Sequence, residues 1–373
     1  MSWPLVKLHD ISRPKQWKTI ASSDLLEAGY PVYGANGRIG YYSEYTHELP
    51  TLMITCRGAT CGNVHISEPR SYINGNAMAI DDIDSSKIDI KYLYYYFLKR
   101  GFSDVISGSA QPQITGQGLT KIEIPLPPLK EQKRIAAILD KADAIRRKRQ
   151  QAIKLADDFL RSVFLDMFGD PVTNPKGWEV KKIRDFLSIK NGYAFKSEYF
   201  VDKGNYVLLT PGNFYEKGGY RDRAGKQKFY DGPVPDSFVL KEGDILLAMT
   251  EQAAGLLGAS MEVPSGLAHL HNQRLGLLIY DFSAVNSKYL LNLFNSPSIR
   301  KAIHANAVGL KVRHTSPSKI EELEIGFPPF DLQEQFSLIV NRTMAAIESM
   351  NIGSLKSEIN FASLSQKAFS GIL

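Results

Sequence analysis

The chain repeats a set of sequence landmarks, in the same order, in its two halves. The pairs are residues 3–11 (WPLVKLHDI) with 178–186 (WEVKKIRDF), 91–93 with 288–290, 121–123 with 319–321, and the double prolines 127–128 with 328–329. Each landmark is weak alone, but four in one order at nearly equal separations indicate duplication followed by divergence. The sequence therefore predicts two related folded units, each followed by a further segment that begins after the double proline.

The composition is that of folded globular domains. Of 373 residues, 43% are apolar and 23% are charged, which suits two domains with real cores and argues against disorder or a membrane protein. The first residues lack the basic and apolar stretches of a signal peptide, and two cysteines are too few for a disulfide-stabilised secreted fold. We therefore expect a cytoplasmic protein. The net charge of +6 permits contact with nucleic acid but does not require it.

A long helix is expected after each double proline, because proline is well placed just before a helix. From Glu131 to about Phe168, apolar residues recur at alternating spacings of four and three, broken only by Arg149, which is a heptad pattern. Its members are Ile138, Ala142, Ile145, Ala152, Ala156, Phe159 and Val163. The second helix, less regular and with a candidate break at residues 351–353, carries Phe336, Val340 and Ile347.

The simplest way to bury both apolar stripes is to pack the two helices against each other. An antiparallel pair would place the two globular units at opposite ends of the helices, related by an approximate two-fold axis. In the alternative arrangement, each helix packs only on its own domain.

The start of the first helix carries a specific motif. Residues 125–135 read Pro-Leu-Pro-Pro-Leu-Lys-Glu-Gln-Lys-Arg-Ile, and residues 328–336 carry a looser second version. With the run YPVYGANG at residues 30–37, these segments make the chain resemble, over its whole length, the specificity subunits of type I restriction-modification enzymes.

The resemblance implies an α+β fold in which two target recognition domains, residues 1–128 and 171–327, are separated by two long helices, residues 129–170 and 328–373. The helices are expected to form an antiparallel coiled coil with pseudo-two-fold symmetry. The resemblance also implies a non-catalytic protein that binds double-stranded DNA and two methyltransferase subunits, joined by restriction and translocase subunits in the full complex. S-adenosylmethionine, ATP and magnesium are expected in those partners, and no cofactor or metal in this chain.

Two recognition domains held apart by a pair of long helices suit a bipartite DNA site, since a duplex presents the same face about every 34 Å. Because the two units have diverged, we expect an asymmetric sequence with unread base pairs between its halves, read in the major groove.

Two loops of the first unit carry side chains suited to bases or phosphates. One follows a predicted strand at residues 51–55 and contains Arg57 and Thr60, and a second strand is predicted at residues 63–67. The other contains Gln111 and Gln113, whose amides match adenine edges. The counterpart of this second loop in the second unit carries Lys311, Arg313 and His314. An ordinary hairpin loop and a polar surface loop explain the same residues equally well.

A basic run interleaved with aromatics lies in the second unit and contains Arg221, Arg223 and Lys226. Phosphate contact is one interpretation, and solvated loop charge is the other. The cluster at residues 146–149 on the first helix is open to the same two readings, or to contact with an acidic partner.

Catalytic motifs do not fit. Residues 219–226 have the wrong glycine spacing for a phosphate loop, and Gln227 stands where Ser or Thr is required. Cys56, Cys61 and His65 lack a second ligand pair for zinc, so small buried thiols are expected instead. Residues 174–177 lack the rest of a methyltransferase motif. A lone methyltransferase or nuclease, and an adaptor that binds only protein, remain the alternatives.

Overall fold

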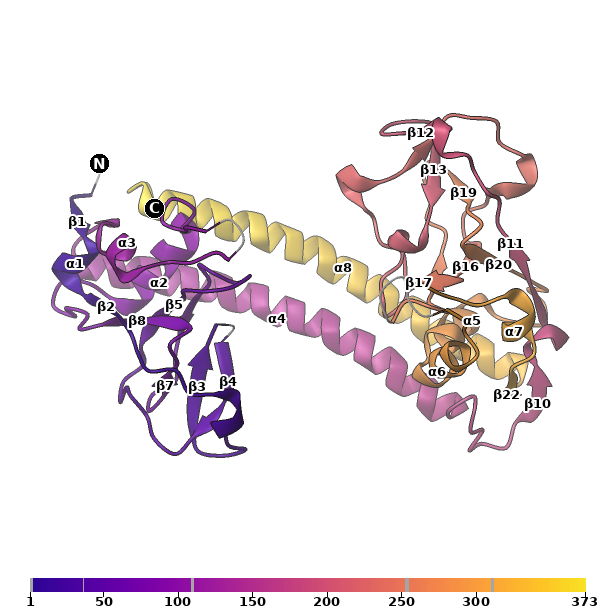
Figure 1. Ribbon diagram of the computed structural model, residues 1–373, viewed down its shortest axis with the longest axis horizontal. Coiled ribbons are helices and arrows are strands. Elements are labelled where there is room, and N and C mark those ends of the chain that lie inside the picture. Colours follow the sequence, from indigo (N-terminus) through magenta and orange to yellow (C-terminus); the bar gives the residue numbers. More distant parts are fainter. Residues whose placement is uncertain (1–2, 36, 109–110, 252–254, 310–311) are drawn as a thin grey trace. The chain divides into compact units, whose positions relative to one another are not determined.

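The computed structural model describes residues 3–35, 37–108, 111–251, 255–309 and 312–373 (Figure 1). Contacts divide the chain into two compact units. The first unit comprises Met1–Gln151 and Met350–Leu373, and the second comprises Ala152–Ser349. Each unit combines helices with largely antiparallel sheets, so the α+β class expected from the sequence is confirmed.

The globular part of the first unit consists of small sheets and short helices. Its strands are β1 (Leu5–Lys7), β2 (Arg13–Gln16), β3 (Tyr30–Gly34), β4 (Gly37–Tyr42), β5 (Leu52–Thr55), β6 (Val64–Ile66), β7 (Tyr72–Ile73), β8 (Ala77–Asp81) and β9 (Glu123–Pro125), and its helices are α1 (Leu8–Ile11), α2 (Ile90–Arg100) and α3 (Gly116–Thr120). The strand orders are β2-β8-β5-β6, β4-β3-β7 and β1-β9. Strands β5 and β6, predicted at residues 51–55 and 63–67, form an antiparallel pair.

Helix α2 shows how the sequence sets these elements. The Asp89 carboxylate accepts hydrogen bonds from the backbone N–H groups of Lys91 and Tyr92 and so caps the helix start. Tyr92, Leu93 and Phe97 are buried in the core together with side chains of β5 and β8. The recurring landmark Lys-Tyr-Leu is therefore the first turn of a core helix.

The globular part of the second unit is larger. Its strands are β10 (Glu179–Lys182), β11 (Leu187–Asn191), β12 (Phe200–Val201), β13 (Tyr206–Leu209), β14 (Phe229–Tyr230), β15 (Val239–Leu240), β16 (Ile245–Ala248), β17 (Thr250–Glu251), β18 (Ser260–Glu262), β19 (Ala268–His271), β20 (Leu275–Tyr280), β21 (Arg313–His314) and β22 (Glu324–Phe327), and its helices are α5 (Ser287–Asn295), α6 (Pro297–Ala305) and α7 (Pro317–Glu321). The strand orders are β11-β20-β16-β18, β12-β14-β13-β19-β15, β10-β22 and β17-β21.

The duplication seen in the sequence recurs in the hydrogen bonds of the two units. A two-stranded sheet closes each unit, β1 with β9 in the first and β10 with β22 in the second. The backbone N–H of Leu8 donates to the Ile122 carbonyl (2.9 Å), and that of Ile183 donates to the Leu323 carbonyl (3.0 Å). The two units are therefore diverged copies of one fold.

Helices α4 (Leu129–Phe168) and α8 (Phe330–Phe369) each contribute to both units. Within the first unit they run antiparallel, because the Arg134 guanidinium donates to the Leu373 carbonyl (2.7 Å) while Arg149, further along α4, donates to the Gly353 carbonyl. Within the second unit, Phe164 of α4 packs edge-on against Phe336 of α8. The two helices therefore pack on each other, and the alternative in which each packs only on its own domain is wrong.

Two sequence expectations about these helices need correction. Helix α8 continues through residues 351–353 without a break, and Arg149 binds both the Gly353 carbonyl and the Ser357 hydroxyl there. Ile145 and Phe159, expected in the apolar seam, are each 50% exposed. The buried positions of α4 are Ile135, Ala136, Leu139, Leu160, Phe164 and Phe168, together with Gln132 and Asp143. The buried stripe thus follows neighbouring positions, because the start and end of α4 pack on the globular cores as well as on α8.

The other seam members are placed as follows. Ile138, Ala142, Ala152, Ala156 and Val163 are half-buried, and Phe336, Val340 and Ile347 of α8 are buried.

Candidate nucleic-acid interface

In the first unit the structure brings the two candidate loops together. Arg57 and Gln113 are paired in an isolated antiparallel bridge, and the Gly58 N–H donates to the Pro112 carbonyl (3.2 Å). The side chains of Arg57, Gln111 and Gln113 are exposed. Residues about fifty positions apart therefore form one continuous polar edge that is open to solvent.

Thr60 has a different place in this edge. Its hydroxyl donates to the Ala35 carbonyl (2.9 Å), and the residue is half-buried. Gly58 and Gly62 adopt positive φ angles of 85° and 95°, which favour glycine and allow the tight turn. Thr60 thus anchors the loop, and Arg57 is the loop residue whose side chain is free to reach a ligand.

The cysteines near this loop belong to the core. Cys56 is buried, Cys61 is half-buried, and burial raises the pKa of both thiols. Among the residues that the structure describes, no three His, Cys, Asp or Glu side chains are grouped to hold a metal.

The second unit carries the equivalent edge. Thr250 pairs with His314 and Glu251 with Arg313 in the β17–β21 sheet. Val308 bridges to His314, as Ser107 bridges to Gln113 in the first unit. Arg313 and His314 are exposed. The matching edges of the two units thus carry different side chains. Lys311, the third candidate of this loop, lies outside the described residues.

Glu251 organises the second edge, although no sequence pattern marks this residue. Its carboxylate is 3% exposed and accepts hydrogen bonds from the N–H groups of Gly255, Leu256 and Leu257 at 2.9–3.1 Å, while His304 Nε2 lies 3.1 Å from its other oxygen. Burial raises the pKa of Glu251, but these N–H groups and His304 outweigh burial and hold the pKa below its usual value. The Arg313 guanidinium in turn lies 3.1 Å from His304 Nδ1.

The basic run of the second unit lines a cavity of about 1240 Å³. Arg221 and Arg223 belong to its wall, whereas Lys226 is exposed and is not among the lining residues. The further cations of the wall are Lys217, Lys228 and Arg274. Arg274 follows β19, about fifty residues after the basic run, so no local sequence pattern links it to the other cations.

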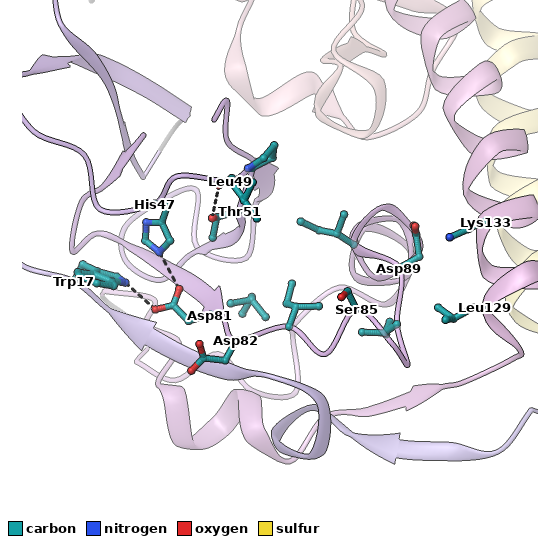
Figure 2. Close-up of a pocket in the computed structure, with 15 residues that line it drawn as sticks. Trp17, His47, Leu49, Thr51, Asp81, Asp82, Ser85, Asp89, Leu129 and Lys133 are labelled. Carbon is teal, nitrogen blue, oxygen red and sulfur yellow. Dashed lines mark hydrogen bonds and ion pairs between the residues drawn. The ribbon is translucent and has the colours of Figure 1, made fainter. Parts of the chain in front are cut away.

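The cavity of the first unit has the opposite character (Figure 2). It has a volume of about 690 Å³ and is lined by Asp81, Asp82 and Asp89, with Lys133 as a cation at its rim. Asp81 accepts from Trp17 Nε1 (3.0 Å) and lies 2.9 Å from His47 Nε2, as the dashed lines in Figure 2 mark. This carboxylate-rich lining is unsuited to a phosphate.

The arginine cluster of α4 makes intramolecular contacts. Arg146 and Arg147 both pair with the buried Asp143 carboxylate, and Arg149 binds α8.

In the described part of the chain, no helix has both the length and the apolarity needed to cross a membrane.

The chain is similar to known DNA-specificity proteins. The family model described as "Type I restriction modification DNA specificity domain" matches residues 2–155 and 175–360. A type I restriction enzyme specificity subunit (MjaVIII) of Methanocaldococcus jannaschii is 22% identical over 88% of this chain and 86% of its own length. Another from that organism (MjaIX) is 31% identical over 38% of this chain and 37% of its own. The solved S subunit of a type I restriction-modification system from M. genitalium shares the fold, with a TM-score of 0.64, 15% identity, and coverage of 99% of this chain and 96% of that one.

Proposed function

Because the chain belongs to the family of type I restriction-modification DNA specificity proteins, we propose that each of its two units reads one half of a bipartite DNA sequence. The chain is the specificity subunit of such a system, a DNA-recognition component without catalytic activity of its own.

The observation that carries the proposal is the repeated edge with different side chains. Both edges are built by the same pairing pattern, yet the first presents Arg57 and Gln113 and the second presents Arg313 and His314. A glutamine amide matches the donor and acceptor of adenine, and an arginine matches the two acceptors of guanine. In the proposal, Gln113 reads adenine in one half-site and Arg313 reads guanine in the other.

Helices α4 and α8 are proposed to fix the number of unread base pairs and to dock two methyltransferase subunits. Exposed apolar side chains on these helices support the docking role, since such side chains are costly to leave in water. They are Ile145, Leu155, Phe159 and Leu165 on α4, and Leu338, Met344, Ile352 and Ile359 on α8. In this proposal the partner subunits bind S-adenosylmethionine, ATP and magnesium, and restriction and translocase subunits join the full complex.

A map of modified bases in host DNA tests the proposal, comparing strains with this gene intact and interrupted. We expect one bipartite methylated motif to disappear on interruption. Replacing residues 1–128 by those of a relative should then change one half of the motif and leave the other intact. A replacement that altered both halves would overturn the division of labour. An unchanged map, in cells that express the protein and its methyltransferase, would favour a protein-binding adaptor.

A further inference from the structure

We propose that the cavity of the second unit seats the phosphate backbone of duplex DNA, so that this unit supplies most of the salt-dependent affinity of the whole protein. This inference rests on the proposed function and adds that the two units contribute unequally to the electrostatic attraction of DNA. It assigns to the cavity a role separate from base reading at the β17–β21 edge.

The charge of the wall is the first argument. Five cations line the cavity, Lys217, Arg221, Arg223, Lys228 and Arg274, against one carboxylate, Glu216. Lys217 pairs with Asp157 of α4 (2.5 Å), but the other four have no ion pair within the described residues. Residues 252–254 are Gln, Ala and Ala, so they offer no countercharge. Four of the five cations of this wall thus have no acidic partner among the described residues, which suits an anionic ligand.

The second argument is that the basic loop is held in place before a ligand arrives. Asn213 is fully buried, and its Nδ2 donates to Gln227 Oε1 (2.8 Å), which ties the two ends of the basic loop together. The Arg221 N–H donates to the Asn213 carbonyl (2.7 Å). A Cβ atom on Gly212 would lie only 2.7 Å from Arg223 Nη1, so glycine there lets the guanidinium lie against the backbone. Ordering the backbone of this loop in advance lowers the entropic cost of binding.

The third argument is the contrast with the first unit. Its cavity is lined by three aspartates, and its arginines Arg38 and Arg70 are already paired with Glu68 (3.6 Å) and Glu48 (3.0 Å). Duplex DNA fits the basic cavity better than a small anion does, because the cations are spread along a wall built from residues 217–228 and Arg274. A continuous row of phosphates can engage such a wall at several points.

The test measures binding of the full chain to two duplexes of equal length, one with the mapped motif and one without it, between 50 and 200 mM salt. The variant is the double substitution Arg223→Ala with Arg274→Ala. The matched control is Lys176→Ala with Lys241→Ala, two exposed cations of the same unit that do not line the cavity. Urea unfolding of every variant checks that the fold is intact.

Each lost phosphate contact reduces the slope of log K against log salt by about 0.9, so the double variant should lose about 1.8 of slope. Over this fourfold salt range, its affinity should then vary roughly tenfold less than that of the unchanged protein. Both duplexes should weaken equally, leaving the preference for the motif unchanged, and the control pair should behave as the unchanged protein does.

An unaltered slope in a folded variant would overturn the inference, as would a loss confined to the duplex with the motif, which would make these arginines base readers. Full competition by millimolar inorganic phosphate at constant ionic strength would also overturn it, in favour of a small-anion site. If instead the unchanged protein shows no preference for the motif, the proposed function itself fails, whatever the slope.

Discussion

Gln132 and Gln333 hold the same place in the two units and make matching hydrogen bonds from fully buried side chains. Gln132 Oε1 accepts from the Asp89 N–H (2.8 Å), and Gln333 Oε1 accepts from the Asn286 N–H (3.0 Å). Their Nε2 atoms donate to Pro127 and Pro328 carbonyls (2.8 and 2.9 Å). Each glutamine therefore fastens the start of a long helix to the cap of the core helix α2 or α5, which explains why a glutamine stands five residues after the first proline of each double proline.

Replacing Gln132 by Met should destabilise the first unit by about 2–4 kcal/mol, because it removes the buried hydrogen bond to the Pro127 carbonyl and the part-buried bonds to the Lys87 carbonyl and the Asp89 N–H. Urea unfolding measures the change. The exposed Gln150 on the same helix provides the control, and Gln150→Met should unfold with the unchanged protein. Equal stability of the two variants would contradict this role of Gln132.

The second unit should lose stability on acidification because of His271. Burial lowers the pKa of this fully buried imidazole from 6.5 to about 4, so between these values the unfolded chain binds a proton that the folded chain does not. Stability is therefore unaffected above pH 6.5 and falls as the pH drops toward 4, by up to about 3 kcal/mol. In His271→Gln the difference in unfolding free energy between pH 7 and pH 5 should shrink. His9→Gln, at an exposed position, should keep it.

Substitutions at the two edges should affect separate halves of the DNA motif. Gln113→Ala should reduce the difference in binding free energy between the preferred base and other bases by about 1–3 kcal/mol at one position of one half-site. Arg313→Ala should have the same effect in the other half-site only. Competition binding with duplexes changed one base pair at a time reads this out. Gln117→Ala, an exposed glutamine on α3 rather than at the edge, serves as the control. Relaxation in both halves by one substitution would contradict the assignment.

The exposed apolar face of α4 should be needed for assembly. Leu155 and Phe159 are 58% and 50% exposed and lie one helical turn apart, so Leu155→Lys with Phe159→Lys places charge in any interface that buries them. Co-purification with the methyltransferase should be lost, while the isolated chain keeps its thermal unfolding midpoint. Gln150→Lys with Gln151→Lys changes exposed polar positions of the same helix and should leave assembly intact. Retained assembly of the first variant would rule out this face.

The fold class, the pairing of the two long helices and the polar loops could be predicted from the sequence, because each local pattern occurs twice in the chain. Periodicity placed the seam of α4 on Ile145 and Phe159, both half exposed, since a helix that packs on a second helix and on a globular core does not keep one strict stripe. Glu251 and Arg274 escaped notice for another reason. Their surroundings come from backbone N–H groups and from distant loops, which leave no local pattern in the chain.

The shared helices also set an order of events during synthesis. The core of the first unit contains Leu8 and Ile11 near the start of the chain and Ala368 near its end, with Phe361 and Phe369 packed against it. Phe361, Ala368 and Phe369 of α8 leave the ribosome only after the entire second unit has been made. The half of the protein that is translated first is therefore completed last, and a chain ending at Ser349 and released from the ribosome would contain all of the second unit beside a first unit with part of its core open to water.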